Sequence, residues 1–172
     1  AAFIMTGGFY LTGLVIKNEW ARETGLILGS AYLTSGVLQT LMKTAVGRAR
    51  PKTNLGPWTF DPFASEDTYH SLPSGHSQIA TVSALVLGHR VKSPILKALF
   101  YSTAGLTMIS RMHSDSHWLS DVAFGGAVSW FCTKAVISRM EENKCQDPLK
   151  KRNRTTWIVT PTPRGVSLVG TF

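Results

Sequence analysis

The stretch SRMHSDSHWLSD, residues 110–121, lies between two apolar segments and concentrates groups that bind or transfer phosphate. His117 and Asp121 are four residues apart, one turn of a helix, so the carboxylate can hold one ring nitrogen and leave the other free as a nucleophile. This is the logic of a catalytic triad applied to a histidine that attacks directly. Arg111 adds a cation for phosphoryl oxygens. The same spacing also occurs in ordinary surface pairs on helices, so this stretch alone does not decide the function.

A second stretch with anion-binding character is Pro73-Ser74-Gly75-His76, directly before an apolar segment. Ser74 is suited to cap a helix, and Gly75 allows a ligand to approach the free backbone N–H groups at the helix start. His76 would then lie at the mouth of this anion site, where it can give a proton to a leaving oxygen. The alternative is an ordinary capped helix with an incidental histidine.

The third stretch, residues 43–51, reads KTAVGRARP and ends an uncharged apolar segment. Lys43 and Arg50 are seven residues apart, so on a helix they point the same way. An arginine fork and a lysine point charge together can neutralise and orient a phosphate. A solvated basic helix end is the alternative for this stretch taken alone.

The pattern outward from these stretches predicts an all-α helical bundle with a short extended C-terminal tail. Apolar segments without strand alternation predict helices, and the residues rich in Pro, Gly, Asp, Ser and Thr at 51–73 predict a long loop. We expect a helical domain over residues 1–139 and a basic linker with an extended tail over 140–172. The expected helices cover residues 1–16, 24–47, 76–88, 95–111 and 118–139, and the extended pieces cover residues 155–159 and 166–169.

Composition limits the class of partner. The chain has 172 residues, 44% of them apolar, and a formal net charge of +8. A chain of this kind can bury a core, and its basic balance suits nucleic acid, an anionic lipid surface or a phosphorylated small molecule, among which charge alone does not choose. The two cysteines, Cys132 and Cys145, have neither metal-ligand spacing nor the density of a disulfide scaffold.

Membrane association is a separate question. A span needs about 20 apolar residues, and only the segment from Thr24 to Met42 comes close. Charge placement argues the other way, because the turns at 17–23 and 89–92 and the basic tail would lie on one side of a bundle, opposite the three motif stretches. That asymmetry fits an integral protein whose site faces outward. The sequence favours a globular or peripheral protein over an integral one because the spans are short.

Together the three stretches resemble, in order and spacing, the signature of the type 2 phosphatidic acid phosphatase superfamily. That superfamily, PAP2, also contains bacterial class A acid phosphatases and vanadium haloperoxidases. Every signature position is filled without substitution, and the resemblance runs from about Thr24 to Arg139. The positions are Lys43, Arg50-Pro51, Pro73 to His76, Ser110-Arg111, His117 and Asp121.

The resemblance implies metal-independent hydrolysis of a phosphomonoester through a phosphohistidine. His117 would be the nucleophile, Asp121 its orienting group, and His76 the general acid and base. The groups expected to bind phosphate are Lys43, Arg50, Ser74, Gly75 and Arg111. No metal or other cofactor is expected, and vanadate would act as an inhibitor that mimics the transition state.

Several functional questions stay open at this point. The substrate could be a lipid phosphate, an isoprenoid pyrophosphate or a small soluble ester, and an anionic membrane surface is a further candidate partner, whereas no nucleic acid is expected. The polar run at 113–116 departs from the apolar spacer of lipid-processing members. The alternatives are a vanadate-dependent haloperoxidase, whose chains are much longer, and a catalytically silent envelope binding protein. We expect a cell-envelope location, periplasmic or membrane-associated. The oligomeric state is not predicted.

Overall fold

A computed structural model describes residues 2–146, 156–162 and 165–171 of the chain. These residues form two compact units, one up to Ile137 and one from Ser138 onward. The first unit is a bundle of α-helices and the second carries a β-hairpin. The predicted fold class, an all-α bundle with a short extended tail, is confirmed.

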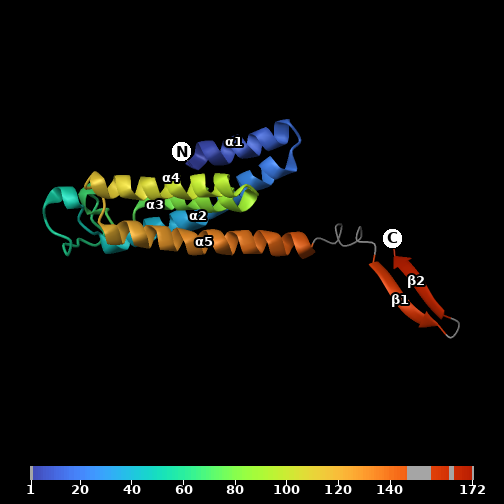
Figure 1. Cartoon of the computed structure of the whole chain (residues 1–172). Helices are drawn as coiled ribbons and strands as arrows, with labels where there is room; N and C mark the ends of the chain where they lie inside the picture. The colour runs from blue at the N-terminus through green and yellow to red at the C-terminus, as the bar shows by residue number, and fades with distance from the viewer. Residues whose placement is uncertain (1, 147–155, 163–164, 172) are drawn as a thin grey trace. The chain divides into compact units, whose positions relative to one another are not determined.

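Five helices run lengthwise through the described chain (Figure 1). Helix α1 packs against α2, α2 against α3, and α3 against α4. A long connection between α2 and α3 contains two short 3₁₀ turns, η1 (Pro51–Thr53) and η2 (Asp67–Tyr69). The helices are α1 (Ala2–Val15), α2 (Glu19–Val46), α3 (Gly75–Arg90), α4 (Pro94–His113) and α5 (Leu119–Gln146).

Local capping explains where α2 begins and ends. The Asn18 side chain accepts a hydrogen bond from the backbone N–H of Ala21, so the helix begins inside the charged patch that the sequence suggested as a turn. Gly47 ends it in the left-handed conformation, with φ of 58°, and donates its N–H to the carbonyl of Lys43. A side chain at Gly47 would also collide with the carbonyl of Asp61, so only glycine fits there.

Helix α5 is longer than predicted. The sequence suggested an end near Arg139, whereas α5 continues to Gln146. The extra residues include Glu141, Glu142 and Lys144, which are good helix formers, so the loss of apolar residues did not mark the helix end.

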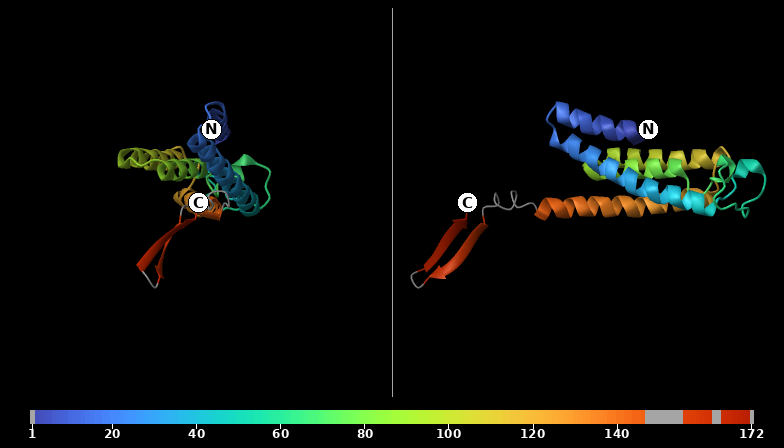
Figure 2. Two further views of the ribbon diagram at one scale, coloured as in Figure 1. Left: turned by 90° about the vertical axis from the view of Figure 1, so that its right-hand side faces the viewer. Right: turned by 180° about the vertical axis from the view of Figure 1, so that it is seen from behind.

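The loops of the bundle bring four helix termini together. The C-terminal ends of α2 and α4 lie beside the N-terminal ends of α3 and α5, next to the loop that joins α2 to α3 (Figures 1 and 2). Backbone hydrogen bonds fix this end. Ser71 donates to the carbonyl of Arg48, and Ser74 donates to the carbonyl of Asp121, each at 3.0–3.1 Å. All three sequence motifs therefore meet at one end of the bundle.

The bundle interior contains polar as well as apolar side chains, while many large apolar side chains lie outside. Fully buried side chains include Leu28 and Val82 but also Thr24, Ser35 and Thr133. Large apolar residues such as Ile95 and Phe131 are exposed instead. Among the described residues, only α2 is long and apolar enough to cross a bilayer, by length and composition. Small and polar helix contacts with an apolar exterior are typical of helices that pack in lipid.

The second unit contains a two-stranded antiparallel sheet, β1 (Thr156–Thr162) and β2 (Gly165–Thr171). Thr156 pairs with Thr171, and Thr162 pairs with Gly165 at the turn. The β-branched residues that suggested extended structure are therefore in strands, although Pro161, expected between them, lies within β1. The basic cluster at 150–154 lies outside the described residues.

Candidate active site

Each predicted site residue lies at the loop end of the bundle. Lys43 is in the last turn of α2, His76 is in the first turn of α3, and Arg111 is in the last turn of α4. His117 lies between α4 and α5, and Asp121 is in the first turn of α5. The helices thus deliver residues that are distant in sequence to one place.

His117 is buried and held in one tautomer. Its side chain is only 4% exposed, and its Nδ1 lies 2.7 Å from the backbone carbonyl oxygen of Ser71. A carbonyl can only accept, so Nδ1 carries the proton and Nε2 keeps its lone pair. Burial, with the nearby Arg50 and Lys43, lowers the pKa of His117 to about 4. The imidazole is therefore neutral near pH 7, as a nucleophile must be.

Asp121 differs from its expected contact. Its carboxylate was expected to hold a ring nitrogen of His117, yet the carbonyl of Ser71 occupies that position. The helical spacing argument fails because α5 begins at Leu119, after His117. Asp121 Oδ2 instead accepts hydrogen bonds from the Ser71 hydroxyl and from the backbone N–H of Trp118. Asp121 therefore reaches His117 through Ser71.

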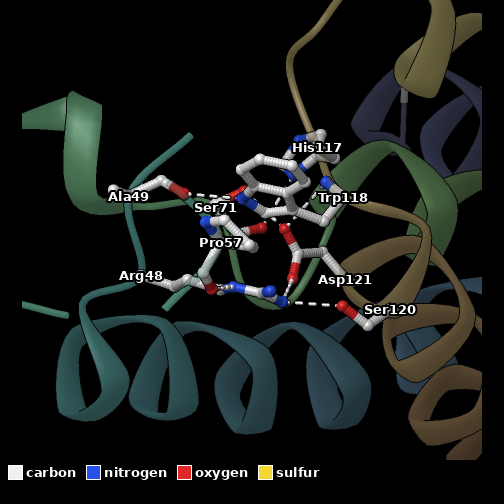
Figure 3. A network of polar contacts seen from close by, with 8 residues as sticks. All are labelled: Arg48, Ala49, Pro57, Ser71, His117, Trp118, Ser120 and Asp121. Atoms are coloured by element: carbon white, nitrogen blue, oxygen red, sulfur yellow. Dashed lines mark hydrogen bonds and ion pairs between the residues drawn. The ribbon is translucent and has the colours of Figure 1, made fainter. Parts of the chain in front are cut away.

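Arg48 completes an orienting network that the sequence reasoning missed (Figure 3). Its guanidinium donates at 2.6 Å to Asp121 Oδ1 and to the Ser120 hydroxyl, and its Nε donates at 2.9 Å to the carbonyl of Pro57. The same guanidinium lies 5.6 Å from the ring centre of Trp118. We use "orienting network" for Arg48, Ser71, Trp118 and Asp121, the residues that surround and fix the position of His117.

The sequence holds one feature that bears on Arg48, its position directly after the end of α2. Arg48 follows Gly47, the residue that ends α2, so its side chain must turn back toward the bundle or out to solvent. Nothing in the local pattern distinguishes these two directions, because the partner Asp121 lies 73 residues away. Ser71 gave even less signal, since its key contact with His117 is made by a backbone atom.

The three predicted cations form a second group, the cation cluster of Lys43, Arg50 and Arg111. Within the described residues, Lys43 makes no ion pair, and the Nε of Arg111 is buried without a hydrogen-bond partner. Arg50 pairs with Asp67, at 2.7 Å between Nη2 and Oδ1, and its Nε donates to the Asp67 carbonyl. Because Asp67 is largely exposed, this pair is screened by solvent and costs little to exchange.

The same cations affect the pKa of His76. Its pKa is lowered by partial burial first and then by Arg111, Lys43 and Arg50. Lys43 and Arg50 act on both histidines, so these two cations lie near both, whereas Arg111 acts on His76. A bound phosphate dianion would oppose this effect and raise the pKa of His76.

The Ser74-Gly75 turn is only partly available to an anion. Ser74 caps α3 by accepting from the N–H of Ser77, is fully buried, and donates its own N–H to the carbonyl of Asp121. The backbone N–H of Ser74 therefore already has a partner within the protein, and the phosphate-binding role of Ser74 stays a prediction. The space beside Gly75 is open, because a Cβ there would meet no heavy atom within 4 Å. The open backbone at the start of α3 thus begins at Gly75.

His70 and two aromatic residues belong to the loop between α2 and α3. His70 Nε2 lies 2.9 Å from the Ala64 carbonyl and pins the loop. The same loop carries Trp58 and Phe63, whose side chains are strongly exposed. Within the described part of the chain, no group of three or more His, Cys, Asp or Glu side chains is placed to hold a metal ion.

Comparison with known proteins shows which family the sequence matches. The model of the PAP2 superfamily matches residues 24–145. A lipid A 1-phosphatase of Rhizobium etli is 35% identical over 119 residues, which are 66% of this chain and 49% of the relative. A lipid A 1-phosphatase of Rhizobium johnstonii is 34% identical over 116 residues, 66% of this chain and 47% of the relative. The chain thus spans about half the length of these relatives.

A solved structure shares the fold. The crystal structure of Aquifex aeolicus LpxE superposes with a TM-score of 0.56 and 18% sequence identity, covering 80% of this chain and 78% of that one. The arrangement of the helices is therefore a known one.

Proposed function

Because the chain belongs to the PAP2 superfamily, we propose that it removes phosphate from a lipid phosphomonoester through a phosphohistidine on His117, without a metal ion. The observation that carries the proposal is the state of His117. It is buried, its pKa is about 4, and its Nδ1 is engaged by the Ser71 carbonyl, which leaves Nε2 free to attack.

In the first half of the reaction, the lone pair of His117 Nε2 forms a bond to phosphorus, and the bond between phosphorus and the leaving oxygen breaks. His76 donates a proton to that oxygen, which departs as an alcohol. The cation cluster and the N–H of Gly75 stabilise the charge on the three equatorial oxygens.

In the second half, water attacks phosphorus and gives a proton to His76. The nitrogen–phosphorus bond breaks, its electron pair returns to Nε2, and inorganic phosphate is released. The orienting network holds the imidazole in the same tautomer throughout, because its acceptor, the Ser71 carbonyl, is fixed by the backbone.

The lipid nature of the substrate rests on two observations. The relatives that match this chain are lipid A 1-phosphatases, so the 1-phosphate of lipid A is the first substrate to test. The bundle also exposes large apolar side chains on α1, α2, α4 and α5, which suits an envelope protein associated with a membrane. The polar spacer at 113–116 does not oppose this, because His113, Ser114 and Asp115 are exposed at the end of α4.

A phosphate-release panel tests the proposal. The full chain in detergent should release phosphate from lipid A in EDTA, and faster than from a small sugar phosphate; phosphatidate and undecaprenyl pyrophosphate complete the panel. His117→Ala should lower kcat by about a thousandfold or more, because it removes the atom that forms the covalent bond.

Two results would contradict the proposal. One is activity that disappears in EDTA and returns with Mg²⁺ or Zn²⁺. The other is a folded His117→Ala protein, checked by circular dichroism, that keeps more than a few per cent of the activity.

A further inference from the structure

An apolar groove of about 670 Å³ lies between α1, α2 and α3. Its walls are formed mostly by apolar and small side chains, and the mechanism above uses none of them. The lining includes Phe3, Leu33, Gly36, Val37, Leu41 and Ile79.

The groove lies on the same helix faces as the phosphate-binding groups. On α2, the lining residues Gly36 and Thr40 precede Lys43 by seven and three residues, so the three share one face. On α3, the lining residue Ile79 follows His76 by three residues, again on one face. Two helices therefore carry the groove directly away from the candidate site.

The position of α1 explains why the groove is open. A Cβ on Gly29 would meet the side chain of Thr6, so α1 covers α2 at that level. Further toward the site, Leu33, Val37 and Leu41 are 68%, 54% and 64% exposed. They are four residues apart and form an uncovered apolar stripe along α2, and the last residue of the stripe, Leu41, is within one helical turn of Lys43 along the helix axis.

We propose that this groove holds an acyl chain of the substrate whose phosphate lies at the cation cluster. The inference rests on the proposed phosphatase function and adds where the chain of the lipid binds. Its support is complementarity, because positive charge at one end and an apolar stripe along the rest match a phosphate head with a hydrocarbon chain. From Leu33 to Leu41, the stripe runs for about 12 Å along α2.

A second groove, between α3, α4 and α5, is the competing location. It is lined by residues that include Tyr101, Gly105, Trp130 and Lys134. Its lining on α5 begins at Trp130, more than ten residues after His117, and only α4 brings it within one turn of a site residue. The groove along α2 and α3 is better connected to the site, and the second groove supplies the control.

Chain-length dependence gives the first test. Butyl and octyl phosphate share a head group, both release an unbranched primary alcohol, and they differ by four methylenes. Each methylene that is half-buried in an open groove should raise kcat/KM about twofold, so octyl phosphate should be about fifteenfold better than butyl phosphate. A ratio below about threefold would overturn the proposal. The same low ratio is the result expected if another segment or helix fills the groove.

Blocking variants give the second test. Val37→Trp, or Leu41→Trp if the first folds poorly, should reduce the octyl-to-butyl ratio to below about threefold, because the indole fills the stripe. Gly105→Leu, in the second groove, should leave the ratio unchanged. The ratio is internal to each protein, so a fraction of unfolded molecules does not affect it.

The pattern of failure identifies which proposal is wrong. If Gly105→Leu loses the octyl-to-butyl ratio and Val37→Trp keeps it, the acyl chain lies in the second groove and the inference is overturned. Turnover of p-nitrophenyl phosphate by the wild type with no chain-length dependence would overturn only the groove. Absence of turnover on every phosphate ester would overturn the phosphatase function, and the groove assignment with it.

Discussion

The orienting network and the cation cluster lie side by side, yet they are built in opposite ways. In the network, Asp121 is fully buried and each of its carboxylate oxygens accepts hydrogen bonds from the protein. In the cluster, the Nε of Arg111 has no partner among the described residues, and Arg50 is held by the exposed Asp67. Groups that must stay in place make their hydrogen bonds within the protein, whereas groups that must bind an anion keep hydrogen-bond donors unused.

Substituting the two arginines on either side of Ala49 gives the largest expected contrast. Arg48→Ala leaves the Asp121 carboxylate buried and unpaired, so it should lower the free energy of unfolding by about 3–5 kcal/mol. Arg50→Ala breaks only a partly exposed pair and should change stability little, but it should lower kcat/KM about a hundredfold through lost phosphate stabilisation. Chemical denaturation and steady-state kinetics measure the two effects. Equal stability losses would show that the two regions are not built differently.

Ser71 and Asp121 provide an intermediate effect inside the network. Because Asp121 contacts the Ser71 hydroxyl and not His117, Ser71→Ala and Asp121→Asn should disturb the same contact and be non-additive in kcat. Each should lower kcat about tenfold to a hundredfold, less than the loss of His117 itself. A Ser71→Thr control keeps a hydroxyl and should recover most of the activity. Fully additive losses would mean that Asp121 acts on His117 by a separate route.

The smallest expected effect is on the titration of His76. Arg111, Lys43 and Arg50 help to lower its pKa in the free protein, so Arg111→Gln should move that pKa upward. Adding inorganic phosphate to the wild type should move it upward too, because the anion offsets the cations. Proton NMR of the His76 ring against pH measures both shifts. If added phosphate leaves the pKa of His76 unchanged, the cluster does not bind the anion next to this histidine.

The sequence motifs predicted the cation cluster better than the orienting network. Lys43 and Arg111 are at helix ends whose positions follow from periodicity and chain breaks, and the two helices they belong to were predicted. The network depends on tertiary contacts between loops, such as that of Arg48 with Asp121, which no local pattern encodes. The assumption that His117 belonged to the helix of Asp121 produced the wrong partner for the imidazole, since α5 begins two residues later.

The backbone contact of Ser71 has a consequence for how this site can change in evolution. The acceptor that selects the tautomer of His117 is a main-chain oxygen, so no single side-chain replacement deletes it. A protein of this kind can drift in sequence around the loop and keep its histidine correctly protonated, as long as the path of the chain before Pro73 is preserved. Loss of function at this point would instead come from insertions or deletions, which move the oxygen away from the ring.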